Sequence, residues 1–168
     1  MKRLALALAL ALAACTSAPS TNDAAGPSAT LIAEAPPDGP AVFVRGRGEG
    51  RTMQVDVVAR GAPTLHGAAL RVTFDPDALA FSGAEPSSAW TRRSMSLAKE
   101  GTPGQLAIAW FEKGGRGIPA DAETVLGTLS FDVKAKKESA IAFRTERSSL
   151  VTPDGKPIPV TFRGGALR

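Results

Sequence analysis

The stretch that decides the fold runs from Gly67 to Phe81 and reads GAALRVTFDPDALAF. Every second residue from position 68 to position 74 is apolar, and the residues between them are small or polar. This period-two alternation predicts a half-buried β-strand. Asp75-Pro76-Asp77 then predicts a turn, because proline fixes φ and has no N–H to donate to a sheet. Leu79 and Phe81 start a second strand.

The same alternation recurs on both sides of this stretch, with glycine- and proline-containing turns between the runs. Its further members are residues 42–44, 53–57, 106–110, 125–133, 141–143 and 160–162. Many short alternating runs with turn signals between them are typical of an all-β antiparallel sandwich or barrel. A chain of 168 residues favours one such domain. Residues 87–99 leave two alternatives open, a short helix capped by Ser87 or a loop followed by an edge strand.

The composition argues against an enzyme, a bound metal and a cofactor. The chain has one His and one Cys, which excludes His-rich and Cys₄ metal sites and leaves any catalytic triad dependent on His66. Asp75, Asp77 and Asp121 are candidates for Ca²⁺ ligands, but carboxylates in such turns more often cap the backbone. We therefore expect a non-catalytic protein without a metal or cofactor.

The N-terminus resembles the signal peptide of a bacterial lipoprotein. Lys2 and Arg3 precede an apolar run from Leu4 to Ala14, which is too short to span a membrane. The run ends in Leu12-Ala13-Ala14-Cys15, which looks like a lipobox. The resemblance implies cleavage before Cys15 and acylation of its thiol, which would anchor the protein in a lipid bilayer. The alternative is an ordinary signal peptide in which the Cys is incidental.

These features divide the chain into a signal peptide (1–14), a lipidated Cys with an Ala/Pro/Ser/Thr-rich flexible linker (15–39) and a folded domain (40–168). Alternatively, residues 30–33 pack on the domain as an edge strand. In Gram-negative lipoproteins an Asp after the lipidated Cys usually signals inner-membrane retention, whereas this chain has Thr16 there. For a Gram-negative host the resemblance therefore implies a place in the cell envelope at the outer membrane. Cleavage would remove Lys2 and Arg3 and leave 18 basic against 16 acidic residues. The sequence has no basic cluster combined with aromatic residues, so it does not indicate nucleic acid binding.

The stretch from Gly67 to Phe81 also resembles the third and fourth strands of a cohesin domain. Residues 123–134 look like the seventh strand of that family, and residues 153–167 look like its closing hairpin. The resemblance implies a jelly-roll sandwich of about nine strands and a non-catalytic module that binds a protein partner, in many members a dockerin. Gly67 and Ala69 stand where well-studied dockerin-binding members often carry Asn and Asp on the outward face.

Two sets of residues are candidates for binding. Arg71 and Thr73 are expected to point away from the core and to form a partner-binding face with Phe111, unless that face is simply solvated or covered by the 86–101 loop. Trp90 is a candidate platform for a sugar ring. Trp110 is expected in the core, because it lies on the same side of its predicted strand as Leu106 and Ile108. The sequence therefore predicts a lipid-anchored protein-binding module, with polysaccharide binding as the alternative and a glycan-active enzyme as a third, less favoured one.

The sequence also has two short basic runs, Arg92-Arg93 and Lys134–Lys137. They either touch anionic glycans or lipid headgroups, or they form solvated edges that discourage strand-to-strand aggregation.

Overall fold

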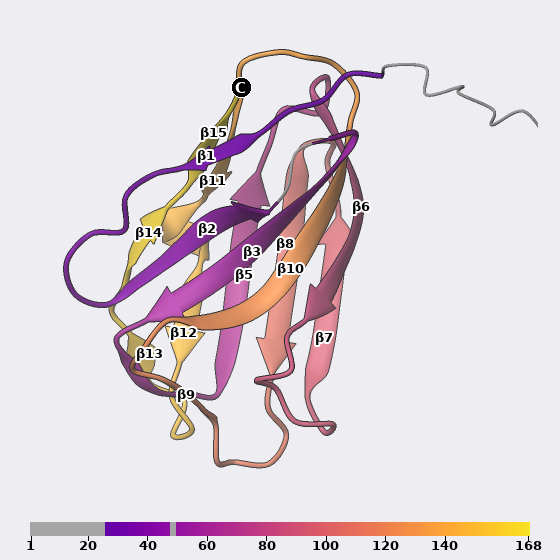
Figure 1. Ribbon diagram of the computed structural model, residues 1–168. Coiled ribbons are helices and arrows are strands. Elements are labelled where there is room, and N and C mark those ends of the chain that lie inside the picture. Colours follow the sequence, from indigo (N-terminus) through magenta and orange to yellow (C-terminus); the bar gives the residue numbers. More distant parts are fainter. Residues whose placement is uncertain (1–25, 48–49) are drawn as a thin grey trace, which may run out of the picture.

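In the computed structural model, which describes residues 26–47 and 50–168, two β-sheets pack face to face (Figure 1). The helical structure of the described residues is a single 3₁₀ turn, η1 (Thr145–Arg147). The strands in chain order are β1 (Leu31–Ala33), β2 (Ala41–Arg47), β3 (Thr52–Arg60), β4 (Ala62–Leu65), β5 (Gly67–Thr73), β6 (Leu79–Pro86), β7 (Met95–Glu100), β8 (Gln105–Phe111), β9 (Ile118–Ala120), β10 (Thr124–Val133), β11 (Ser139–Phe143), β12 (Ser149–Val151), β13 (Pro157–Ile158), β14 (Thr161–Arg163) and β15 (Gly165–Leu167).

The first sheet is built around β5. One edge of β5 pairs with β8, which pairs with β7, and the other edge pairs with β12 and then with β11. β13 extends this sheet beyond β12, and β15 and β1 extend it beyond β11. The second sheet has the order β14-β2-β3-β10-β6, and β4 and β9 form a separate pair. All these pairs are antiparallel except β14 with β2.

The predicted all-β two-sheet sandwich is confirmed, and the Gly67–Phe81 stretch forms β5, a turn and β6 as expected. The described residues contain more strands than the expected nine or so, because segments of two to four residues pair at the edges and corners. In the turn, Asp75 Oδ1 accepts the N–H of Asp77 at 2.9 Å, so this carboxylate caps the backbone as anticipated. Lys137 Nζ lies 2.7 Å from Asp75 Oδ2 and holds the pKa of that carboxyl below its usual value.

The core lies between the two sheets and is filled by the inward residues of each alternating run. Trp110 of β8 is fully buried, as its parity predicted. Phe131 of β10 packs edge-on against Phe74 and Phe81, with ring centroids 5.2 and 5.9 Å apart. Aromatic pairs in this edge-to-face arrangement add to the stabilisation that burial alone provides.

A β-bulge in β10 shapes one end of the core. The register of β10 against β3 shifts between Val125 and Gly127, which leaves Leu126 outside the regular ladder. Its carbonyl accepts hydrogen bonds from the N–H of Ser87 (3.1 Å) and the indole Nε1 of Trp90 (2.6 Å). A bulge interrupts backbone pairing, and here the loop after β6 satisfies the carbonyl that the bulge leaves without a strand partner.

Residues 87–99 form the second of the two predicted alternatives, a loop followed by the edge strand β7. The alternative reading of residues 30–33 is also the one observed. β1 pairs with β15, and Leu31 is buried, so the last part of the predicted linker packs on the sandwich.

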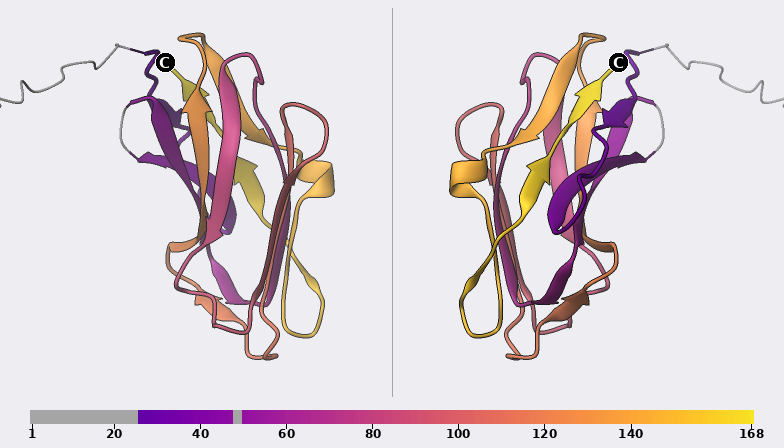
Figure 2. Two further views of the ribbon diagram at one scale, coloured as in Figure 1. Left: turned by 90° about the vertical axis from the view of Figure 1, so that its right-hand side faces the viewer. Right: turned by 90° about the vertical axis from the view of Figure 1, so that its left-hand side faces the viewer.

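Both ends of the described chain lie at the same end of the sandwich. The N–H of Thr30 donates to the carbonyl of Arg168 at 2.8 Å, and the N–H of Arg168 donates back at 3.0 Å. β9 and the loops between β6 and β7 and between β8 and β9 lie at the opposite end (Figures 1 and 2). One end of the sandwich therefore carries both ends of the described chain, and the opposite end carries these loops and β9.

Candidate partner-binding surface

The outer face of β7, β8 and β5 carries side chains that neighbouring strands bring into rows. Gly67, Phe111 and Met95 form one row across the three strands. Ala69, Ala109 and Leu97 form the next row. These residues share one face because successive side chains in a strand point to opposite sides; the residues between them, such as Leu70 and Trp110, are in the core.

An apolar patch occupies this face, and we define it by Ala69, Met95, Leu97, Ala109 and Phe111. Met95 and Leu97 are 56% and 58% exposed. Phe111 and the two alanines are half-buried. Single exposed apolar residues are common on protein surfaces, whereas a group of neighbouring apolar residues that includes large side chains is a candidate interaction site.

Small residues on β5 allow the Phe111 ring to lie down on the sheet. An added Cβ at Gly67 would lie 2.2 Å from Cδ1 and 2.3 Å from Cε1 of that ring. The ring therefore occupies the space that any side chain at position 67 would need.

Basic residues border the apolar patch at the other end of the strands. Ala107 of β8 pairs with Arg71 on one side and with Lys99 on the other, which gives a further row. Arg71 also lines a shallow pocket of about 110 Å³ together with Arg144 and Arg147. This row lies four residues along β8 from Phe111, a separation of about 13 Å at the rise of a strand.

The structure places all three predicted partner-binding residues, Arg71, Thr73 and Phe111, on this one face. Arg71 is exposed, and Thr73 and Phe111 are half-buried. Sequence alone does not identify Met95 and Leu97 as members of this face, because residues 87–99 suit a short helix as well as an edge strand. The alternation of Met95, Leu97 and Lys99 with smaller residues was the available signal.

The outer face of the second sheet is different, because several of its charges are paired within the chain. Asp56 of β3 is buried and accepts from Arg47 Nη2 at 2.9 Å and from Thr128 Oγ1 at 2.7 Å. Arg45 forms an ion pair with Glu123 nearby. With Asp56, Arg47, Arg45 and Glu123 already paired within the chain, this face is the weaker candidate for a partner.

The interpretation of Trp90 as an exposed platform for sugars is wrong. Its side chain is 6% exposed and belongs to the core cluster, and its Nε1 donates to the carbonyl of Leu126. The bulge in β10 supplies that carbonyl, so tertiary structure turns the indole inward from a loop whose sequence is polar. The ring has no free face on which a sugar can stack.

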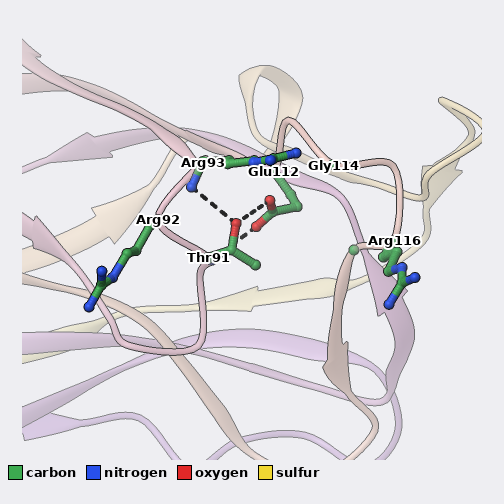
Figure 3. Close-up of a pocket in the computed structure, with 7 residues that line it drawn as sticks. Thr91, Arg92, Arg93, Glu112, Gly114 and Arg116 are labelled. Carbon is green, nitrogen blue, oxygen red and sulfur yellow. Dashed lines mark hydrogen bonds between the residues drawn. The ribbon is translucent and has the colours of Figure 1, made fainter.

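A second feature, the arginine pocket, lies where the loops after β6 and β8 meet (Figure 3). We define it by Thr91, Arg92, Arg93, Glu112, Gly114, Arg116 and Gly117, which line a pocket of about 470 Å³. Glu112 is buried, and its carboxylate accepts from the backbone N–H of Thr91 at 3.0 Å and from the Thr91 hydroxyl at 2.5 Å. These hydrogen bonds, that of the hydroxyl first, hold the pKa of Glu112 below its usual value.

Two other sequence candidates form no site among the described residues. His66 Nδ1 is buried without a hydrogen-bond partner there, while its backbone N–H and carbonyl join Val151 and Glu112. No group of three or more His, Cys, Asp or Glu side chains in the described ranges is close enough to hold a metal ion. Within the same ranges, no helix has the length and hydropathy needed to cross a membrane.

The predicted signal peptide and the lipobox Leu12-Ala13-Ala14-Cys15 lie outside the described residues.

Comparison with known proteins agrees with this architecture. The model of the cohesin domain family matches residues 44–165, so the chain belongs to the cohesin domain family. Cohesin domains are non-catalytic binding modules. A search of curated proteins found no match.

Solved cohesins share the fold at low sequence identity. The sixth cohesin of scaffoldin B from Acetivibrio cellulolyticus, in complex with a Cel5 dockerin, is 15% identical with a TM-score of 0.66; the match covers 76% of this chain and 96% of that one. The cohesin of a type I cohesin–dockerin complex from Clostridium thermocellum is 19% identical with a TM-score of 0.59, over 80% and 96% of the two chains. A non-cellulosomal cohesin from the archaeon Archaeoglobus fulgidus is 16% identical with a TM-score of 0.56, over 80% and 86%.

Proposed function

We propose that this protein is a non-catalytic binding module that holds a protein partner on the outer face of β7, β8 and β5. The observation that carries the proposal is the exposure of Met95 and Leu97 beside Phe111. Apolar anchors surrounded by polar residues are the arrangement from which protein interfaces obtain most of their binding energy.

Membership of the cohesin family supports a protein as the ligand, since relatives of this fold are seen in complex with dockerins. The outward positions of β5 in these rows are Gly67 and Ala69, which have no polar side-chain groups. Hydrogen bonds from these positions are therefore absent, and apolar contact has to supply the recognition there. A dockerin that depends on polar contacts at these positions is not the partner that this face fits.

We also propose that acylated Cys15 anchors the module in a lipid bilayer of the cell envelope, at the outer membrane. The support is the sequence Leu12-Ala13-Ala14-Cys15, the apolar run before it and Thr16 after it. Several acyl chains together give stable membrane attachment. We do not propose carbohydrate binding, because Trp90 is buried.

The partner-binding face is tested with a photoreactive benzoylphenylalanine placed at Leu97 in the full-length protein in its own host. The control carries the same group at Gln54, an exposed residue of β3 in the second sheet. We expect a specific covalent adduct with a protein from position 97 only. Purified unmodified domain should suppress this adduct, and a domain carrying Leu97→Asp should not. Equal adducts from both positions, or none, would reject the face.

A further inference from the structure

We propose that the arginine pocket receives a carboxylate of the protein that binds the sheet face, so that the partner presents an acidic segment next to its apolar anchor. This inference rests on the proposed function and specifies the chemistry of the partner. It assigns a binding role to a pocket that lies beyond the end of the sheet and outside the apolar patch.

The pocket carries unpaired positive charge. Arg92 and Arg93 come from the loop between β6 and β7, and Arg116 comes from the loop between β8 and β9. All three are exposed, and none forms an ion pair with another part of the chain that the structure describes. Three arginines against the single carboxylate of Glu112 leave the pocket lining at a net charge of +2.

Glu112 does not use up this positive charge, because its carboxylate is occupied elsewhere. Both of its oxygens accept hydrogen bonds from Thr91, and the residue is only 3% exposed. The N–H of Arg93 in turn lies 3.2 Å from the Thr91 hydroxyl oxygen. Figure 3 shows this short network joining the two loops. Arg92 and Arg116 are directed away from Glu112 on either side, whereas the Arg93 side chain runs across Glu112 toward Gly114 in this view. Glu112 thus joins the loops that carry the arginines, and in the part of the chain that the structure describes its carboxylate forms no ion pair with any of the three guanidinium groups.

The pocket is continuous with the apolar patch along the chain. Phe111 of the patch directly precedes Glu112, and Met95 follows Arg93 by two residues. A partner segment whose apolar side chain rests on Phe111 and Met95 therefore lies over the ends of β8 and β7 from which the two loops of the pocket continue. At the opposite end of the patch, Arg71, Arg147 and Lys99 continue the positive border.

Carboxylates match the chemistry of this lining. A guanidinium presents planar paired N–H donors that fit the two oxygens of a carboxylate, and charge-assisted bonds of this kind are stronger than neutral ones. Complementary charge around an apolar centre raises the association rate and selects the partner. A protein is favoured over an acidic glycan because the neighbouring patch offers Met, Leu and Phe and the one loop tryptophan is buried.

The test uses the purified domain (residues 26–168) and a display library of random twelve-residue peptides as the probe. Peptides are selected on the wild-type domain and then measured by titration against the double variant Arg93→Glu/Arg116→Glu. The matched control is Arg163→Glu, which reverses an exposed arginine on β14 of the other sheet. Leu97→Asp reports separately on the apolar patch. Thermal unfolding of each variant confirms that it is folded.

We expect the enriched peptides to combine Asp or Glu with a large apolar residue. Their affinity should fall about tenfold or more in the double variant, a change that corresponds to loss of a charge-assisted contact. Arg163→Glu should leave the affinity unchanged, replacement of the peptide carboxylates by amides should reproduce the loss, and added salt should weaken binding.

Peptides whose affinity falls in Leu97→Asp but not in Arg93→Glu/Arg116→Glu would overturn this inference and leave the proposed function standing. Peptides that ignore Leu97 would reject the sheet face itself. The absence of any enriched peptide would also overturn the inference. Polygalacturonate is titrated against the same variants as the acidic glycan. If its binding is lost in Arg93→Glu/Arg116→Glu but kept in Leu97→Asp, the pocket binds an acidic glycan and the inference of a protein carboxylate is overturned.

Discussion

The ring of Phe111 lies directly over its cross-strand neighbour Gly67, so that the two positions share the space of one side chain. They face each other across β8 and β5, and a Cβ at position 67 would come within 2.2 Å of the ring. The absence of a side chain on one strand therefore sets the position of the aromatic residue on the next, at the centre of the proposed partner-binding face.

Gly67→Ala should push the Phe111 ring off the sheet. Because the ring is half-buried and can move outward, we expect a loss of about 1 kcal/mol in the free energy of unfolding, at the lower end of overpacking costs. Urea unfolding followed by tryptophan fluorescence measures this loss. In a Phe111→Ala background the added methyl group has space, so Gly67→Ala should then cost nothing. An equal cost in both backgrounds would show that the ring is not the obstacle.

Gly127→Ala should be more harmful, because the obstacle is in the core. An added Cβ at position 127 would lie 2.4 Å from Cζ2 of Trp110 and 2.7 Å from the carbonyl of Glu85. We expect a loss of about 3 kcal/mol, the upper end for overpacking, measured by urea unfolding. Gly83→Ala on β6 is the matched control, since nothing lies within 4 Å of its added Cβ, and it should be neutral. Similar losses for both would contradict the packing of Trp110.

Glu112→Gln should alter how stability depends on acid. The pKa of Glu112 is lowered in the folded protein. The ionised carboxylate therefore contributes fully to the free energy of unfolding above the unfolded pKa of about 4.3. This contribution is lost as the pH falls through the lower folded pKa. We therefore expect the variant to have the lower melting temperature at pH 7 and the difference from wild type to narrow on acidification. The control Glu138→Gln, an exposed residue, should show no such narrowing. A constant difference for Glu112→Gln would argue against the Thr91 hydrogen bonds.

Cys15→Ser should abolish acylation. We expect metabolic labelling with an alkyne fatty acid to mark the wild-type protein and to leave the variant unlabelled, because serine lacks the thiol that forms the thioether. The variant should also keep residues 1–14 and migrate as a larger precursor. Ser17→Ala is the control and should be labelled and processed normally. Labelling of Cys15→Ser would reject the lipobox interpretation.

The predictions from sequence were strongest where one strand and its own turn carry the information. The alternation in Gly67–Phe81 correctly identified two strands, the cap at Asp75 and the outward direction of Arg71. Period-two patterns fix which side chains share a face, and this also placed Phe111 and Trp110 on opposite sides of β8.

The features that sequence analysis missed all depend on partners distant in the chain. Trp90 is buried because it bonds to Leu126, which lies 36 residues later. β7 exists as an edge strand because β8 is available to pair with it, whereas its own sequence also suits a helix. The arginine pocket combines two loops that only the folded sandwich brings together, so no local sequence pattern predicts it.

The mutual hydrogen bonds of Thr30 and Arg168 have a practical consequence for handling this protein. Since the chain enters and leaves the sandwich at the same place, a tag, a surface linkage or a neighbouring domain attached to either terminus starts from that one pole. The arginines at the other pole stay clear of it by the full length of the strands. Immobilisation through the N-terminus is thus the orientation of choice for binding measurements, and a molecule held by the distal loops would stand a domain's length away from the support.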